Sequence, residues 1–226
     1  MIPLNESSSA SATTGLAANG GSSTTNGIDV SDYQPNVNWK AVNNSGYSFA
    51  YAKATEGTHW AAHTFAPNWT GLVSAGMRRG AYHMFRFDQD PIAQAKHFLS
   101  VAKPASGDLP PALDLELAVP HGAERAVADI AAFLAAVENV TGAACVLYLG
   151  YYFWQGALGA TTRFSDHPLW LAQYSGGSQP SLMPSAWSSW TLWQYTDKKP
   201  VGGVAGAVDA DYFNGNSDAL GALTLP

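Results

Sequence analysis

The chain's clearest chemical feature is a pair of carboxylic acids two residues apart in an apolar segment. Asp114 and Glu116 lie within the sequence PALDLELAVP. If this segment is a strand, both side chains point to the same face, with Cα atoms about 6.6 Å apart. Two carboxylates crowded into an apolar site repel each other, which raises the pKa of one of them. One carboxyl can then stay protonated near neutral pH as a general acid, while the other stays ionised and stabilises positive charge.

This division of roles is what hydrolysis of a glycosidic bond requires, and it is our leading chemical hypothesis. Two other interpretations of the pair stay open, a structural ion pair and a metal cage. Lysine and arginine are scarce in the surrounding sequence, which disfavours a local ion pair. His59 and His63 are spaced as i and i+4 but lack an HExxH pattern, so we expect them to be surface residues.

Short apolar segments alternate with helical patterns from residue 27 onward, and these elements must position the acids. Eight candidate strands span residues 27–31, 47–55, 79–85, 110–117, 144–150, 169–174, 191–196 and 208–213. Candidate helices begin at about residue 39 and span residues 66–76, 90–102, 121–140 and, more briefly, 151–159. The last three strands are joined by segments rich in Pro, Ser and Gly, without a helical pattern.

This alternation predicts an α/β fold with a parallel sheet, and eight strands predict its closure. The expected architecture is a modified TIM-type barrel, in which about five β/α units are followed by three strands that lack regular helices. No sequence repeat and no second domain are visible. We therefore predict one catalytic barrel domain over residues 27–226.

A closed barrel would bring further acids to the pair, because barrel enzymes carry their chemistry at the C-terminal ends of the strands. Asp29 closes the first predicted strand, and Asp209 lies on the last one. The first and last strands are neighbours in a closed barrel, so both side chains are expected to face the same pocket as the pair. Asp32 and Asp211, in contrast, are expected to be loop or capping residues.

Aromatic and polar side chains occur together at the predicted strand ends, a mixture suited to binding sugar rings. The residues that we expect to bind substrate are Tyr33, Tyr82, Tyr148, Trp193 and Gln194. Each of them is, from sequence alone, as well suited to the core as to a groove wall. Lys53 and Glu56 end the second predicted strand, where they are expected to pair with each other or with the acidic cluster.

The composition argues against several classes of protein. The 226 residues carry a net charge of −6, which disfavours nucleic acid as a partner because such binding needs a basic surface. Cys145 is the single cysteine, so we expect a buried thiol and no internal disulfide. Without a CxxC motif or a Cys/His cluster, no structural metal is predicted. No apolar stretch reaches the length of a membrane span.

The N-terminal segment, residues 1–26, differs from the rest of the chain. It is rich in Ser, Thr, Gly, Ala and Asn and lacks the apolar core of a signal peptide, so we predict a flexible low-complexity leader. Asn-x-Ser/Thr sequences occur at Asn5, Asn43, Asn68 and Asn139, which is weak support for passage through a secretory route.

Eight motifs occur in the chain in this order: GIDVSDYQ, FAYAKATEG, RGAYHMF, LPPALDLE, VLYLGYYFW, PLWLAQY, LWQYTD and VDADYFNG. Together they resemble the motifs of glycoside hydrolase family 25, the Chalaropsis-type lysozymes. They cover nearly everything from residue 27 to about residue 221. One such motif would mean little, whereas eight in order make a specific signal.

The resemblance implies a secreted N-acetylmuramidase that cleaves the β-1,4 bond between N-acetylmuramic acid and N-acetylglucosamine in bacterial peptidoglycan. By this match Glu116 is the general acid/base, and Asp114 stabilises the cationic transition state or orients the substrate's 2-acetamido group, which favours net retention. Asp29 and Asp209 would tune the charge and hold the site. No cofactor and no metal are implied, and we expect a monomer that does not insert into membranes.

Three alternatives stay open at this point. The barrel could bind peptidoglycan or a chitin-like sugar without cutting it. It could be a metal-dependent hydrolase whose carboxylates ligate a hard cation. It could also be a glycosidase acting on another N-acetylhexosamine polymer. The chain departs from the family pattern at Asp32 and Asp211, where family members often have a neutral residue, and extra negative charge there would raise the pKa of the acid.

Overall fold

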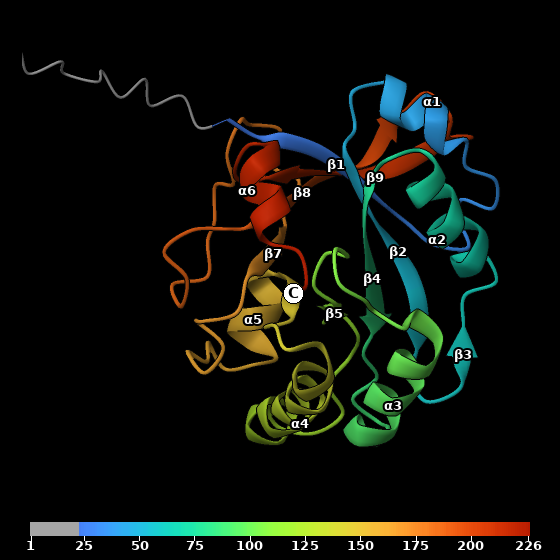
Figure 1. Ribbon diagram of the computed structural model, residues 1–226. Coiled ribbons are helices and arrows are strands. Elements are labelled where there is room, and N and C mark those ends of the chain that lie inside the picture. The colour runs from blue at the N-terminus through green and yellow to red at the C-terminus, as the bar shows by residue number, and fades with distance from the viewer. Residues whose placement is uncertain (1–22) are drawn as a thin grey trace, which may run out of the picture.

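The computed structural model describes residues 23–226, and within them eight strands close into a barrel (Figure 1). The barrel strands run in the order β1-β9-β8-β7-β6-β5-β4-β2, and β1 pairs with β2 to close it. Their bounds are β1 Thr25–Val30, β2 Phe49–Glu56, β4 Arg78–Met84, β5 Ala112–Asp114, β6 Val146–Gly150, β7 Leu169–Ala172, β8 Leu192–Pro200 and β9 Ala207–Phe213. The predicted strands and the predicted α/β barrel are confirmed.

The strand β9 corrects the expectation of a parallel sheet. It runs antiparallel to both of its neighbours, β1 and β8, whereas the other barrel pairs are parallel. The cause is the short connection from Pro200 to Ala207, because a parallel return needs a crossover of about a dozen residues or more. The start of β9 therefore lies at the same end of the barrel as the C-terminal ends of the other strands.

Helices surround the first part of the barrel, as the sequence predicts, and Figure 1 shows α2, α3 and α4 outside β2, β4 and β5. Their bounds are α1 Trp39–Asn44, α2 Phe65–Ser74, α3 Pro91–Ala102, α4 Ala123–Thr141 and α5 Tyr151–Gly156. The N-cap Asp90 of α3 accepts a hydrogen bond from the backbone N–H of Ala93 at 2.7 Å, as expected of Asp-Pro at a helix start.

Two small elements are absent from the predicted set. The strand β3 (Trp60–Ala61) folds back antiparallel on the end of β2, and the helix α6 (Ser217–Ala222) follows β9. Asn216 caps α6 by accepting a hydrogen bond from the N–H of Ala219 at 2.9 Å. Both elements are too short to show a periodic pattern, so local contacts decide them.

The apolar core has two layers, one between barrel and helices and one inside the barrel. In the outer layer, α4 buries Ile130, Phe133 and Val137 against the strands, each contributing roughly 1.5–3 kcal/mol. The inner layer is built from rings, among them Phe49 and Tyr51 of β2. Gly80 makes room for Tyr51, because a Cβ atom at this position would lie 2.2 Å from the Tyr51 ring.

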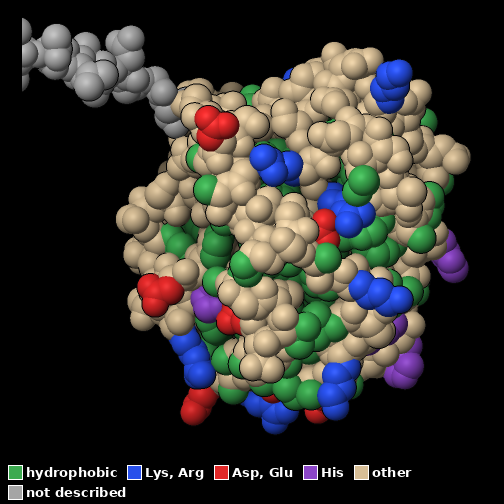
Figure 2. Space-filling view, viewed as in Figure 1, with side chains coloured by type: hydrophobic (Ala, Val, Ile, Leu, Met, Phe, Trp, Pro, Cys, Tyr) green, Lys and Arg blue, Asp and Glu red, His purple; other side chains and the backbone are tan. Residues whose placement is uncertain are grey.

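The surface carries charges of both signs, and the Asn-x-Ser/Thr sequences differ in their exposure. Basic and acidic side chains are interspersed on the face drawn in Figure 2. Asn139 is exposed, whereas the Asn68 side chain is buried and accepts a hydrogen bond from Trp39 Nε1 at 3.3 Å, which makes it a poor acceptor for a glycan. Asn5 and residues 1–22 of the predicted leader lie outside the described residues, and β1 begins inside that leader, at Thr25.

Candidate active site

A pocket of about 220 Å³ lies at the end of the barrel where the parallel strands finish, and we call it the acidic pocket. It is lined by Asp29, Ser31, Tyr33, Lys53, Tyr82, Met84, Asp114, Glu116, Tyr148, Trp170, Tyr174, Gln194, Asp197 and Asp209. The four predicted catalytic acids are therefore brought together by β1, β9 and the segment that starts with β5. Below them lie aromatic rings, with Tyr51 and Trp170 4.8 Å apart between ring centroids.

Asp114 and Glu116 share the pocket as predicted, although the strand that carries them is shorter than expected. β5 ends at Asp114, and the N–H of Leu115 still donates to the carbonyl of Tyr148 on β6 at 2.9 Å. This contact keeps the chain extended, so both acids project into one space. Asp114 is only 5% exposed, whereas Glu116 stands at the open mouth. The oxygen Oδ1 of Asp114 is buried without a hydrogen-bond partner among the described residues.

Asp29 and Asp209 face each other across the β1–β9 pair, where they are in register. Asp211 lies two residues further along β9, and its Oδ2 is buried without a hydrogen-bond partner among the described residues. Burial and repulsion from Asp211 and Asp209 raise the pKa of Asp29 well above its usual value, which favours a proton on this cluster. The Gln194 amide completes it, because Nε2 donates to Asp29 Oδ2 at 2.8 Å.

The prediction that Asp211 is a loop or capping residue is wrong. Asp211 lies within β9 and is fully buried, and Trp170 Nε1 donates to its Oδ1 at 2.8 Å. Residues two apart on a strand share a face, so a strand that turns Asp209 inward turns Asp211 inward as well. The matching prediction for Asp32 is confirmed, since its carboxylate accepts hydrogen bonds from the N–H and hydroxyl of Thr64, the N-cap residue of α2.

The pKa of each acid in this cluster is raised. Burial is the main cause for Asp114, and repulsion from Glu116 adds to it. Burial also raises the pKa of Asp209 to about 6, with added repulsion from Asp197. Burial raises the pKa of Glu116 too, while the nearby Lys53 ammonium opposes the shift. Protonated carboxyls are therefore present well above the pH at which exposed acids ionise.

Lys53 and Glu56 form the ion pair that the sequence predicts, with Nζ and Oε2 2.9 Å apart. The second oxygen of Glu56 lies 3.0 Å from Arg86 Nη1, so two cations hold this one carboxylate. Its pKa is lowered, because the hydrogen bonds and charges of Lys53 and Arg86 outweigh its partial burial. Lys53 also lowers the pKa of Asp114 and Glu116, so both predicted partnerships of Lys53 are present.

Gln194 organises the aromatic side of the pocket. Its Oε1 accepts hydrogen bonds from the hydroxyls of Tyr148 at 2.9 Å and Tyr174 at 2.8 Å. Tyr82 is buried beside these groups, and Tyr33 stands at the rim with 91% of its surface exposed. Four of the five residues expected to bind substrate therefore line the pocket, with polar tips and flat faces directed to one space.

Trp193 is the exception, and its expected place in the groove is wrong. The indole is fully buried among Trp190, Tyr195 and Tyr212, and its Nε1 donates to the carbonyl of Gln173 at 2.7 Å. Adjacent residues on a strand point to opposite faces. Since Gln194 faces the pocket, its neighbour Trp193 must face the outer core.

The sequence reasoning missed five lining residues: Ser31, Met84, Trp170, Tyr174 and Asp197. Trp170 and Tyr174 are an even number of positions apart, at the start of β7 and just beyond its end, so the same alternation indicates that both face inward. Asp197 has no such signal, because its place depends on how β8 extends past the barrel toward β9.

The remaining chemical candidates lie outside this pocket. His59 and His63 are exposed, as predicted, and Cys145 is a buried free thiol. Among residues 23–226, His, Cys, Asp and Glu side chains form no group of three or more arranged to hold a metal ion. Within the same residues, no helix combines the length and apolar character needed to cross a membrane.

Comparisons with known proteins agree with this architecture. Residues 28–204 match the family model of "Glycosyl hydrolases family 25". Lysozyme M1 of Streptomyces globisporus is 38% identical over 212 residues, which are 87% of this chain and 70% of that protein. The N,O-diacetylmuramidase of Chalaropsis sp is 33% identical, over 88% of this chain and 99% of that protein. The crystal structure of a bacterial lysozyme from Streptomyces coelicolor superposes with a TM-score of 0.85 at 36% identity, covering 89% of this chain and 97% of that one.

Proposed function

Because the chain belongs to glycosyl hydrolases family 25 and is a glycoside hydrolase, we propose that it acts as a lysozyme on bacterial peptidoglycan. The bond cut is the β-1,4 bond between N-acetylmuramic acid and N-acetylglucosamine, in keeping with relatives named muramidase. The observation that carries this proposal is the meeting of Asp29, Asp114, Glu116 and Asp209 in one pocket at the barrel mouth.

Glu116 is proposed as the general acid/base. A general acid must be protonated at the working pH and must reach the leaving oxygen. Burial raises the pKa of Glu116, and the side chain is the more exposed member of the Asp114–Glu116 pair. It can therefore donate a proton to the glycosidic oxygen as the bond to the anomeric carbon breaks, and later take a proton from the attacking water.

Asp114 is proposed to orient the 2-acetamido group of the muramoyl ring. Its buried Oδ1 has no partner among the described residues, and an unsatisfied buried acceptor is costly, so a donor from substrate suits this position. The acetamido N–H is such a donor. Held there, the acetamido oxygen attacks the anomeric carbon as the leaving oxygen departs, and water then opens the cyclic intermediate with net retention.

The other pocket residues are proposed to support these two acids. Burial raises the pKa of Asp29 and Asp209, which keeps the charge of the site low, and Gln194 fixes the orientation of Asp29. Tyr33, Tyr82 and Tyr148 contact the sugar rings. No cofactor or metal enters this scheme. We expect the protein to be secreted, because its proposed substrate lies in the cell wall.

The test is digestion of purified bacterial peptidoglycan, with identification of the new reducing ends by mass spectrometry. The wild-type protein is expected to release ends that carry N-acetylmuramic acid, while Glu116→Gln and Asp114→Asn release few. Glu124→Gln, which changes an exposed acid in the first turn of α4, is the matched control. New ends that carry N-acetylglucosamine would refute the stated bond, and retention on the wall without new ends would favour a binding barrel.

A further inference from the structure

A second cavity, of about 550 Å³, adjoins the acidic pocket, and we call it the side cavity. It shares Ser31, Tyr33 and Lys53 with the acidic pocket, so the two form one continuous groove. Its volume falls within the roughly 300–1,000 Å³ range of small-ligand pockets. A substrate held at the acids would therefore reach into the side cavity with whatever it carries on that side.

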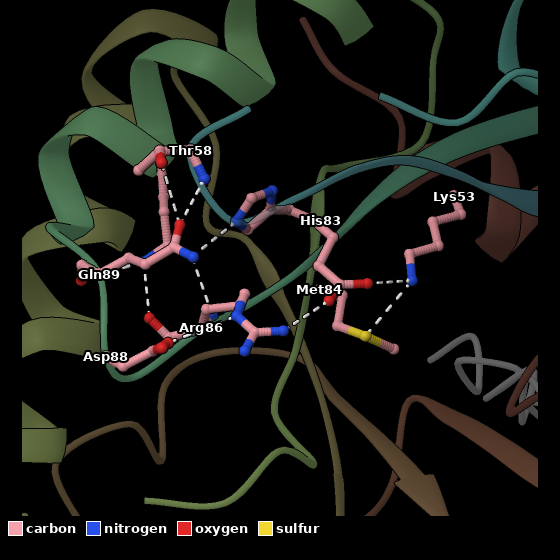
Figure 3. Close-up of polar contacts among 9 residues, drawn as sticks. Lys53, Thr58, His83, Met84, Arg86, Asp88 and Gln89 are labelled. Carbon is pink, nitrogen blue, oxygen red and sulfur yellow. Dashed lines mark hydrogen bonds and ion pairs between the residues drawn. The ribbon is translucent and has the colours of Figure 1, made fainter. Parts of the chain in front are cut away.

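The walls of the side cavity are held by a hydrogen-bond network, shown in Figure 3, that joins the segments after β2 and β4. Gln89 Oε1 accepts from the N–H of Thr58 at 2.7 Å and from its hydroxyl at 3.0 Å. The fully buried Gln94 accepts from the N–H of Arg86 at 2.8 Å and donates to its carbonyl at 2.9 Å. Arg86 thus stands on a fixed backbone.

The histidine that contacts this network, His83, does not change its charge near neutral pH. Gln94 also contacts His83 Nε2 at 3.2 Å, and burial lowers the pKa of that imidazole to about 3. His83 is therefore neutral near neutral pH, and it adds no charge beneath Arg86.

The side cavity differs from the acidic pocket because two cations, Lys53 and Arg86, line it beside the carboxylates of Asp32 and Glu56. Glu56 is neutralised by both Lys53 and Arg86. Arg86 uses Nη1 for Glu56 and Nε for Asp88, which leaves the donors of Nη2 without a partner among the described residues. The Arg86 side chain is 40% exposed. Its Nη2 donors can therefore bind a carboxylate of the substrate.

Aromatic rings complete this cavity. The hairpin formed by β2 and β3 projects Trp60, which is 39% exposed, and Tyr33 faces the same space from the other side of the groove. Lys53 Nζ lies 5.0 Å from the centre of the Trp60 ring, within cation–π range, which fixes the ring at the junction of the two pockets. Flat faces beside a cation suit a sugar that carries an acidic group.

We propose that the side cavity binds the carboxylate-bearing substituent of a muramoyl residue, with Arg86 as the anion partner and Trp60 as the stacking wall. This inference rests on the proposed function, since it takes peptidoglycan as the substrate. The shared chemistry is a carboxylate on the 3-O-lactyl branch. It comes either from the lactyl group itself, where the peptide has been removed, or from the stem peptide attached to it.

The test compares kcat/KM on two soluble glycan preparations, intact strands with stem peptides and strands stripped of peptides by an amidase. Arg86→Gln is expected to lower kcat/KM about tenfold, through KM, on strands that carry the bound carboxylate. If Arg86→Gln lowers kcat/KM on intact strands alone, the bound carboxylate belongs to the stem peptide. If it lowers kcat/KM on stripped strands alone, the bound carboxylate is that of the lactyl group. Trp60→Ala is expected to lower kcat/KM on both preparations, and Arg86→Lys to retain part of the activity.

The control is Arg163→Gln, which changes an exposed arginine outside both cavities, with thermal melting to confirm that each variant is folded. If folded Arg86→Gln and Trp60→Ala match the wild type within about twofold on both preparations, the side cavity does not bind this substituent, although the enzyme still cuts peptidoglycan. If the wild type cuts neither preparation, the proposed function itself fails.

Discussion

The acidic pocket and the side cavity share Lys53, yet they treat carboxyl groups in opposite ways. In the acidic pocket, Glu116 and its neighbours are crowded together, and burial raises the pKa of each. In the side cavity, Glu56 lies between two cations, and its pKa is lowered. The two glutamates are the same residue type, so burial and neighbouring charges decide whether the carboxyl keeps a proton or stays ionised.

This contrast indicates that the two parts of the groove have different roles. An acid whose pKa is raised by burial is poised to exchange protons, which suits bond cleavage. An acid held by two cations has no proton to give, but it fixes Lys53 and Arg86 in place. The predictions below test this contrast, beginning with the largest expected effect.

The two glutamates are expected to differ most in turnover. Glu116→Gln removes the general acid and should lower kcat by about a thousandfold, whereas Glu56→Gln should lower it by less than about tenfold. Initial rates on solubilised peptidoglycan, measured at saturating substrate, check this. Similar losses in both variants would remove the distinction between the two regions.

Lys53 is expected to set the alkaline limb of the pH–rate profile. A general acid must be protonated, so activity falls as pH rises through its pKa, and Lys53 lowers the pKa of Glu116. Lys53→Met should therefore move the alkaline limb of kcat/KM to higher pH, by on the order of half a unit to one unit. Lys96→Met, an exposed lysine on α3, is the control. A shift to lower pH would contradict the account.

Stability should depend on pH in opposite directions in the two regions. The pKa of Asp209 is raised to about 6, so its protonated form favours the folded state, and this stability is lost as pH rises through about 6. Asp209→Asn should therefore be more stable than the wild type at pH 7, by on the order of 1 kcal/mol, and equal to it at pH 3.

Glu56 has a lowered pKa, so the stability that it contributes is present above pH 4.5 and is lost on acidification. Glu56→Gln should be less stable at pH 7, by up to about 1 kcal/mol, and unchanged at pH 3. Urea unfolding of both variants at the two pH values decides the question. If the free energy of unfolding changes with pH in the same direction in both variants, the two acids do not have opposite surroundings.

The smallest expected effect is that of a chelator. The pKa values of the pocket carboxyls are raised, and a protonated carboxyl is a poor ligand for a hard cation. EDTA should leave the rate of peptidoglycan cleavage unchanged. A loss that added Mg²⁺ or Ca²⁺ restores would favour the metal-dependent alternative.

Much of the site follows from strand alternation and barrel closure. Closure predicts that Asp29 and Asp209 meet, and they are in register across β1 and β9. The two wrong predictions within the site concern Asp211 and Trp193. Both ignored the strand alternation that places Asp209 and Gln194 correctly. The direction of β9 also follows from its connection to β8, which is too short for a parallel crossover.

The side cavity could not be predicted from the sequence in this way. It depends on the two-residue strand β3 and on long-range contacts, such as Gln89 with Thr58 and Arg86 with Glu56. None of these leaves a periodic signal, and each joins segments about 30 residues apart. The sequence therefore does not show that the pKa of Glu56 is lowered while the pKa values of the pocket acids are raised.

The most direct test of this account is a ¹³C NMR titration of the glutamate side chains. The chain has only five glutamates, and Glu116→Gln and Glu56→Gln would each remove one signal and so assign it. The account predicts a midpoint above 4.5 for Glu116 and below 4.5 for Glu56 in the same protein. A midpoint for Glu116 at or below that of Glu56 would contradict it.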